Sequence, residues 1–294
     1  MKRPTKRPKV AVAGYLSLDT IRCPGGTFAD VVGGGALYAA LGGVVMGGDV
    51  HLVARVGHDF PQRALEDLAA LGIRLDALER VATPSRRSEL IERDASPDSR
   101  RTTPAYGDAQ WWERTNALAP MPLDAPLDAY MVAAMPAAVA RAHIRVARRH
   151  GALVVADTSE AFARTEPEAL LRIAGEVDVF APSREEVRWL LDDDDASAHA
   201  RLAAQTPIVV QKRGADGYWL SAHGGPPSSQ PSRATRVVDT TGAGDASVGA
   251  LMVGLAQGLA PAAALELAAT IAARAVSAVG PAGLGLALPT VVES

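Results

Sequence analysis

The chain has 294 residues, with 30 Lys and Arg against 33 Asp and Glu, a formal net charge of −3 and 48% hydrophobic residues. This composition is that of a globular protein and excludes a disordered chain or a collagen-like repeat. Near-neutral charge also argues against a general nucleic-acid surface, because such binding depends on clustered Lys and Arg that neutralise phosphates.

The cysteine count, the basic N-terminal residues and the apolar runs predict the cellular compartment of the protein and the kinds of partner it has. Cys23 is the single cysteine, so no internal disulfide can form, which indicates a reducing compartment. Basic residues crowd the first nine positions between prolines, and we expect residues 1–9 to form a disordered, solvated tail. The apolar stretch Val10–Ala13 is too short for a secretory signal, and no uninterrupted apolar run is long enough to span a membrane. We therefore expect a cytoplasmic protein with one domain over residues 10–294 and with neither a membrane nor a nucleic-acid partner.

Short β-branched runs alternate with longer Ala- and Leu-rich stretches along most of the chain. Strands are predicted, in chain order, at residues 9–19, 50–57, 129–135, 152–157, 177–183 and 207–214. Helices are predicted at residues 35–48, 61–72, 137–151 and 184–192. The short apolar strands indicate a mainly parallel sheet buried on both faces, and the alternation indicates a doubly wound α/β fold.

Two segments interrupt this alternation. Residues 85–115 are polar, and two strand-like pieces within them flank Asp94–Asp98. This pattern predicts a hairpin or flap over one edge of the sheet, with a long surface loop as the alternative. Residues 221–236 are rich in Gly, Pro and Ser, which is typical of a loop or hairpin.

The most informative segment is Val237–Gly258, in which a polar turn and the run Gly242–Ala243–Gly244–Asp245 precede a long apolar helix. Glycines allow the tight turn, and the free N–H groups at a helix start bind anions such as phosphate. A carboxylate beside such a site repels phosphate, so its expected task is that of a general base towards an attacking hydroxyl. The alternative is that Asp245 only favours the helix dipole and that the glycines serve packing.

Two segments together resemble the ribokinase-like, or PfkB-type, carbohydrate kinases. The first is the glycine-rich stretch Val31–Phe60, with Gly48–Asp49–Val50 followed by Val56–Gly57–His58–Asp59. The second is Asp239–Asp245, which matches the family pattern DTxGAGD without a gap. The resemblance covers roughly Val10 to Gly285 and implies the fold of that family, a doubly wound, mainly parallel sheet with a small lid.

The resemblance also implies roles for individual residues. The catalytic residues would be Asp245 as base and Gly242, Ala243 and Gly244 as the anion hole. The acceptor-binding residues would be Asp19, Gly34, Gly35 and Tyr38. The residues beside ATP would be Ser183, Lys212, Gly214 and Gly217. Glu186 would act on Mg²⁺ through water.

The chain departs from the family pattern at three places. Tyr38 stands where the family often has Asn, which suggests a differently shaped, ring-stacking pocket. Ser183 replaces the Asn of the Asn-x-x-Glu motif, whereas Glu186 is retained, so dependence on Mg²⁺ is still expected. The interval from Asp19 to Gly33 is short for the lid strands of a typical ribokinase. We therefore expect a shortened lid, more like that of the inositol-kinase and nucleoside-kinase-like branches.

The function implied is an ATP-dependent kinase that phosphorylates a hydroxyl of a small polyol, a sugar or an inositol-like cyclitol. The aromatic content of 4% offers few rings for a nucleobase, which favours these acceptors over a nucleoside. A nucleoside kinase of the same fold and a non-catalytic ligand-binding descendant remain alternatives. A nicotinamide dehydrogenase would need GxGxxG directly after the first strand, whereas Gly33–Gly35 lie well past Asp19. Dependence on a monovalent cation such as K⁺ and assembly into a homodimer are left open.

Overall fold

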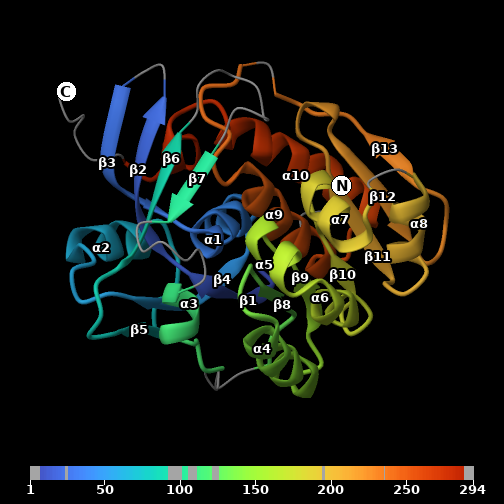
Figure 1. Cartoon of the computed structure of the whole chain (residues 1–294), viewed down its shortest axis with the longest axis horizontal. Coiled ribbons are helices and arrows are strands. Elements are labelled where there is room, and N and C mark those ends of the chain that lie inside the picture. The colour runs from blue at the N-terminus through green and yellow to red at the C-terminus, as the bar shows by residue number, and fades with distance from the viewer. Residues whose placement is uncertain are drawn as a thin grey trace.

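The computed structural model describes residues 7–23, 26–91, 101–104, 111–120, 126–193, 196–234 and 236–287. A nine-stranded sheet runs through the centre of the molecule, and a four-stranded sheet stands at one end of it (Figure 1). Most of the expected basic tail, residues 1–6, lies outside the described residues. Lys9 does not belong to a tail, because it is the first residue of the first strand.

The central sheet confirms the mainly parallel, doubly wound fold. Its strands, in spatial order, are β13 (Ser228–Gln230), β12 (Tyr218–Ala222), β11 (Ile208–Lys212), β10 (Val179–Phe180), β9 (Leu153–Ala156), β8 (Ala129–Val132), β1 (Lys9–Tyr15), β4 (Asp49–Val56) and β5 (Leu78–Arg80). In this spatial order, the strands β11, β10, β9, β8, β1, β4 and β5 all run parallel to one another. At the other edge, β12 pairs antiparallel with β11 and forms an antiparallel hairpin with β13. The segment expected as a loop or hairpin is therefore a hairpin.

Helices cover both faces of this sheet. One face packs against α1 (Gly35–Val45), α2 (Gln62–Ala70), α9 (Ala243–Ala256) and α10 (Pro261–Ala275). The other face packs against α4 (Ala137–Arg149), α5 (Glu160–Thr165), α6 (Pro167–Ala174), α7 (Arg184–Leu191) and α8 (Ala196–Ala203). Strand β1 serves both layers, with Val10 and Val12 in one core and Ala11 and Ala13 in the other. This two-sided burial explains why the inner strands β8, β9 and β10 are apolar without interruption.

Helices α1 and α9 pack backbone against backbone because both carry small residues. A Cβ atom added to Gly42 would lie 2.1 Å from the carbonyl oxygen of Ala246. One added to Gly249 would lie 1.9 Å from the carbonyl oxygen of Ala39. This close approach holds the two helices in a fixed register and sets their first residues side by side.

The predicted strand over residues 9–19 is wrong as a single element, because the chain leaves the central sheet at Leu16. Its second half forms β2 (Ser17–Cys23), which belongs to the smaller sheet. The sequence changes character at the same point. Strand β1 is buried on both faces, whereas β2 is fully buried only over its first residues and becomes partly exposed in the stretch from Thr20 to Cys23. Asp19 therefore lies within a lid strand and does not end the first strand.

The smaller sheet, which we call the lid, has four strands. Strands β2 and β3 (Gly26–Gly33) come from the short interval around Asp19 and Gly33, and β6 (Arg86–Ile91) and β7 (Arg101–Pro104) come from the polar segment expected as a flap. The spatial order is β3-β2-β6-β7. The expected hairpin thus exists, but it extends the lid and does not cover an edge of the central sheet, because β6 pairs in parallel with β2.

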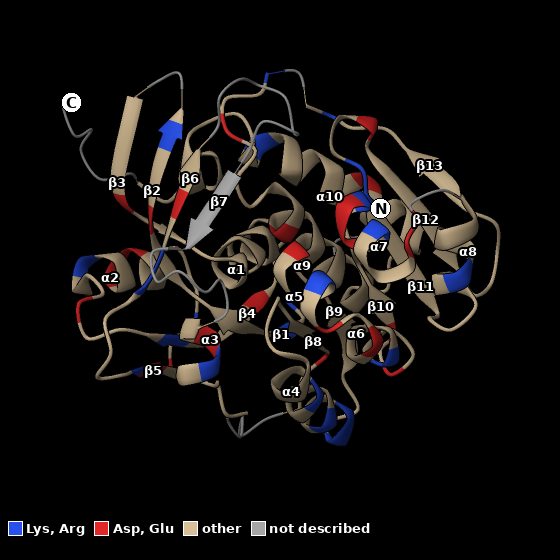
Figure 2. Ribbon diagram, in the orientation of Figure 1, with Lys and Arg blue, Asp and Glu red and all other residues tan. Residues whose placement is uncertain are grey.

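Charged residues of both signs are spread over the described elements, and arginines gather on α4 (Figure 2). Among the residues that the structure describes, no helix combines the length and the apolar character needed to cross a membrane.

Candidate active site

A run of three glycines joins lid strand β3 to helix α1 and lies beneath two carboxylates. A Cβ atom added to Gly33 would lie 2.2 Å from Oδ2 of Asp19, and one added to Gly35 would lie 2.6 Å from Oδ1 of Asp245. Gly34 between them has a φ of +99°, a conformation that side-chain-bearing residues rarely adopt. Two residues of extended chain span at most about 7 Å, so the two carboxylates lie within reach of one small molecule. The role of Gly33 is one that the sequence analysis missed.

Asp19 is buried, with an exposed fraction of 5%. Its Oδ2 accepts a hydrogen bond of 2.9 Å from the hydroxyl of Ser17, two residues earlier on the same face of β2. A carboxylate is costly to bury unless donors surround it, and the Ser17 hydroxyl is one such donor.

The predicted anion site is the segment Asp239–Asp245, which we call the anion loop and which leads into α9. Gly242 is the N-cap residue and has a φ of 70°, and the helix begins at Ala243. The ring of Tyr38 lies directly beneath this turn, since a Cβ atom on Gly242 would come within 2.0 Å of it. Tyr38 is only 2% exposed, so neither face of its ring is open for stacking on an acceptor. We expected Tyr38 to belong to a ring-stacking pocket. Its position beneath Gly242 instead favours a role in supporting the loop.

Asp239, the first residue of the motif, holds the loop in place. Its two carboxylate oxygens accept hydrogen bonds from the backbone N–H of Thr241 at 2.8 Å and of Gly280 at 2.6 Å. Gly280 begins the short 3₁₀ helix η3 (Gly280–Leu284), so Asp239 ties the anion loop to a segment that follows α10. At 2% exposed, Asp239 is a structural residue, in contrast to Asp245 at the other end of the motif.

A buried ion pair lies beside the anion loop. Lys212 ends β11, and its side chain passes 3.1 Å from the position of a Cβ atom on Gly244. Its Nζ lies 2.6 and 2.7 Å from the two carboxylate oxygens of Asp157, which directly follows β9. Burial favours the neutral amine, but the charges of Asp157, Glu186 and Asp245 outweigh it and raise the pKa of Lys212, which keeps the ammonium charged. The sequence analysis missed Asp157, although an acidic residue directly after a buried strand could have indicated it.

Ser183 and Glu186 form a reciprocal cap at the start of α7. The backbone N–H of Ser183 donates to Oε2 of Glu186 at 2.6 Å, and the N–H of Glu186 donates to the Ser183 hydroxyl at 3.1 Å. Ser can make this capping box, so its replacement of Asn preserves the helix start. Burial raises the pKa of Glu186 to about 8, against the lowering effect of Lys212, and the charges of Asp157 and Asp245 raise it further.

The structure therefore brings most of the predicted residues to one region. Ser183 pairs with Lys212 through an isolated β-bridge, which places the α7 cap beside the ion pair. Gly214 and Gly217 lie next along the chain, at the two ends of the 3₁₀ turn η2 (Gly214–Asp216) that connects β11 with β12.

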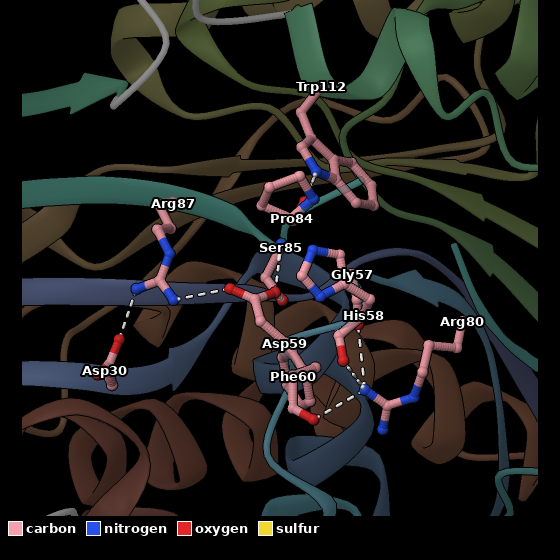
Figure 3. A network of polar contacts seen from close by, with 10 residues as sticks. All are labelled: Asp30, Gly57, His58, Asp59, Phe60, Arg80, Pro84, Ser85, Arg87 and Trp112. Carbon is pink, nitrogen blue, oxygen red and sulfur yellow. Dashed lines mark hydrogen bonds and ion pairs between the residues drawn. The ribbon is translucent and has the colours of Figure 1, made fainter. Parts of the chain in front are cut away.

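The Gly57–His58–Asp59 motif anchors the lid to the body of the protein (Figure 3). Asp59 accepts hydrogen bonds of 2.6 Å from both the backbone N–H and the hydroxyl of Ser85, just before β6 begins. It also accepts one of 3.0 Å from Arg87, whose guanidinium reaches on to Asp30 of β3 at 2.5 Å. These hydrogen bonds outweigh the effect of burial and hold the pKa of Asp59 well below its usual range. Asp59 thus fixes the point at which the chain enters the lid.

Comparison with known proteins agrees with this geometry. The family model described as pfkB family carbohydrate kinase matches residues 8–285. A nucleoside kinase of Burkholderia thailandensis, solved in complex with inosine, is 21% identical with a TM-score of 0.76, over 92% of this chain and 92% of that chain. The nucleoside kinase of Methanocaldococcus jannaschii, described as an archaeal member of the ribokinase family, is 19% identical with a TM-score of 0.74, over 97% and 95%. The adenosine kinase of Sinorhizobium meliloti is 18% identical with a TM-score of 0.73, over 94% and 96%. No curated protein sequence matches the chain.

Proposed function

The chain belongs to the PfkB family of carbohydrate kinases, and from this premise we propose that it transfers the γ-phosphoryl group of ATP to a hydroxyl of a small sugar or cyclitol. Membership of the family makes the protein a phosphotransferase and implies ATP as the donor. The observation that carries the proposal is the placement of Asp19 and Asp245 at the two ends of the Gly33–Gly35 run. One carboxylate belongs to the lid and the other to the anion loop, so an acceptor between them would meet both.

On the donor side, the N–H groups at the start of α9 would bind the transferring phosphoryl group. Such groups are fixed before the reaction and need no reorganisation as charge develops. Lys212 adds a positive charge beside Gly244, and Asp157 holds its ammonium in place. These residues support stabilisation of the phosphate charge without any covalent intermediate on the protein.

On the acceptor side, Asp245 would accept the proton of the attacking hydroxyl. Asp19 would accept hydrogen bonds from other hydroxyls of the same molecule and so fix which hydroxyl reaches Asp245. A general base of this kind contributes about 10²–10⁴ in rate.

The residues present also fit the use of Mg²⁺. Within the described part of the chain, no three His, Cys, Asp or Glu side chains gather to hold a metal ion by themselves. Mg²⁺ commonly keeps several waters and binds through substrate phosphates with one or two carboxylates. Glu186 and Asp157, next to Lys212, offer such carboxylates. The ion would neutralise charge on the phosphates.

A nucleoside acceptor is the main alternative, since the three similar structures described above are two nucleoside kinases and an adenosine kinase. Four rings are candidates to stack on a nucleobase, those of Tyr38, Tyr106, Trp111 and Trp112, and the burial of two of them argues against this alternative. Tyr38 and Trp112 are 2% and 1% exposed, and Tyr106 lies outside the described residues. Trp111, the fourth candidate ring, is 37% exposed and could still stack on a base. The retention of Asp245 at the anion loop argues against a non-catalytic binder.

A coupled assay of ADP release tests the proposal. Sugars, cyclitols and nucleosides are screened with and without Mg²⁺, using the wild type and Asp245→Asn in parallel. We expect ADP release with a sugar or cyclitol that depends on both Mg²⁺ and Asp245. Activity restricted to nucleosides would overturn the acceptor class, and the absence of activity with every acceptor would overturn the function.

A further inference from the structure

The lid presents an arginine on the same face as Asp19. Strands β2 and β6 are parallel, with Ser17 opposite Arg86 and Asp19 opposite Ser88. Residues two apart on a strand share a face, so these four side chains belong to one surface of the lid. A guanidinium N–H of Arg86 donates to the Ser88 hydroxyl at 3.0 Å, which orients the arginine along this surface.

A buried carboxylate holds the same arginine from the other side. Glu113 lies in the short helix α3 (Trp111–Thr115), and its Oε1 accepts a hydrogen bond of 2.6 Å from Nε of Arg86. The Glu113 side chain is 5% exposed, whereas that of Arg86 is 24% exposed. The Arg86 side chain is therefore partly exposed, while that of Glu113 is covered.

The second carboxylate oxygen of Glu113 receives no hydrogen bond from the part of the chain that the structure describes. This oxygen, Oε2, is buried. A buried acceptor without a donor is costly, so this oxygen would be stabilised by a donor from outside the described residues.

The charges of this cluster do not cancel. Burial favours the neutral form of Arg86, but the charges of Glu113 and Asp19 outweigh it and raise the pKa of the guanidinium, which shows that both carboxylates act on it. Asp19 and Glu113 contribute two negative charges and Arg86 one positive charge. Counted over these three described side chains, the formal charge is −1. A hydroxyl can donate to either carboxylate and accept from Arg86, whereas a phosphate or carboxylate group can only accept and is repelled by the excess charge.

We propose that Arg86 and Glu113 are specificity-determining residues that select uncharged polyhydroxy acceptors over acceptors that carry a phosphate or carboxylate group. This inference rests on the proposed function, because it assumes that the acceptor binds beside Asp19. Glu113 positions Arg86 and supplies the negative charge that excludes anions. Arg86 donates to an oxygen of the acceptor.

Binding measurements on the full chain test the proposal without requiring turnover. D-ribose, D-ribose 5-phosphate, myo-inositol and inositol 1-phosphate are titrated by calorimetry at fixed ionic strength, in the presence of a non-hydrolysable ATP analogue. We expect the wild type to bind the neutral member of at least one pair tenfold or more tightly than its phosphate ester. Equal or tighter binding of both phosphate esters would overturn the proposal before any variant is made.

Variants then test the residues themselves. Glu113→Gln keeps the shape and removes the excess charge, so the preference for the neutral acceptor should fall by about tenfold, as expected for the loss of one nearby charge. Glu89→Gln is the matched control, because Glu89 pairs with Arg22 on the opposite face of the same two strands. This control should leave the preference unchanged.

The outcomes separate this inference from the proposed function. An unchanged preference in folded Glu113→Gln, or an equal change in Glu89→Gln, would overturn the role of Glu113. If Glu113→Gln does not fold, Arg86→Lys is tested in its place. Lys keeps the positive charge but lacks the forked guanidinium donor. This variant should therefore bind neutral acceptors more weakly than the wild type and keep the selectivity against phosphate esters. Selective binding without ADP release from any acceptor would refute the kinase function and leave the specificity surface standing.

Discussion

Asp19 and Asp245 are 226 residues apart by their numbers, yet their carboxylates rest on the first and the last glycine of a single three-residue run. The contact is so close that neither Gly33 nor Gly35 has space for a methyl group. The glycines therefore set the positions of the acceptor-binding carboxylate and of the base, and this relationship can be tested directly.

Gly35→Ala should reduce turnover strongly and change stability little. Gly35 is the first residue of α1, where Ala is tolerated, but its Cβ atom would lie 2.6 Å from Oδ1 of Asp245 and displace that carboxylate. We expect kcat to fall by about 10²-fold, since a small displacement of a base removes much of its contribution. Steady-state kinetics measure the loss, and thermal unfolding should move by only a few degrees. In an Asp245→Ala background the same substitution should have no further effect on kcat, and a further tenfold loss there would contradict this explanation.

Asp245→Asn should abolish turnover and leave ATP binding nearly intact. Asn keeps the size of the side chain but cannot take a proton, and loss of a general base typically costs about 10²–10⁴ in rate. Single-turnover assays and calorimetry with an ATP analogue provide the two readouts. Turnover within twofold of the wild type would remove Asp245 from the role of base.

Asp239→Asn, in the same motif, should instead lower stability. Asn has one oxygen, so it can accept only one of the two backbone hydrogen bonds that Asp239 now accepts from Thr241 and Gly280. Leaving one buried N–H without an acceptor costs about 1–3 kcal/mol of unfolding free energy. Urea denaturation measures this loss. A variant as stable as the wild type would show that the loop does not depend on Asp239.

Glu186→Gln should raise the Mg²⁺ concentration needed for half-maximal rate more than it changes the KM of the acceptor. Gln keeps an oxygen that can accept from the N–H of Ser183, so the start of α7 should survive. The variant loses the negative charge that a cation would meet. Because burial raises the pKa of Glu186 to about 8, the wild type should require less Mg²⁺ as the pH rises through that value, and the variant should not. A magnesium titration that is the same for both proteins would leave Glu186 only as a capping residue.

His143 should make the protein less stable in acid. Its Nε2 lies 3.1 Å from the carbonyl oxygen of Leu118, to which it donates, and its Nδ1 lies 2.8 Å from the Tyr130 hydroxyl. Burial lowers the pKa of His143 from 6.5 to about 4. Between pH 6.5 and pH 4 this histidine takes up a proton in the unfolded chain but not in the folded protein. The free energy of unfolding should therefore fall by about 3 kcal/mol as the pH drops from 6.5 to 4.

Urea denaturation at pH 7 and at pH 4.5 checks this, with His143→Gln as the comparison. The variant lacks the titrating ring, so its stability should fall less between the two pH values, whatever its stability at neutral pH. An equal fall in both proteins would assign the acid sensitivity to other groups.

The sequence by itself determined the features that depend on neighbouring residues. The alternation of short apolar runs with longer Ala- and Leu-rich stretches indicates a parallel α/β fold, because buried parallel strands are apolar on both faces. The run Gly242–Asp245 indicates an anion site at the start of a helix, because turn, helix start and carboxylate are all contiguous. Both are local patterns, so they could be recognised without knowledge of the packing.

Only the tertiary structure decided which distant residues meet. The break at Leu16 moves Asp19 into the lid, and the pairing of β2 with β6 and of β6 with β7 adds Arg86–Ile91 and Arg101–Pro104 to the same sheet. Packing of α1 against α9 buries Tyr38 beneath Gly242 and sets Gly35 against Asp245. These contacts depend on strand order, register and the distance between two helix axes, and each of these is the result of many weak interactions between remote parts of the chain. No local pattern encodes them, which is why the motifs were visible in the sequence and the geometry that joins them was not.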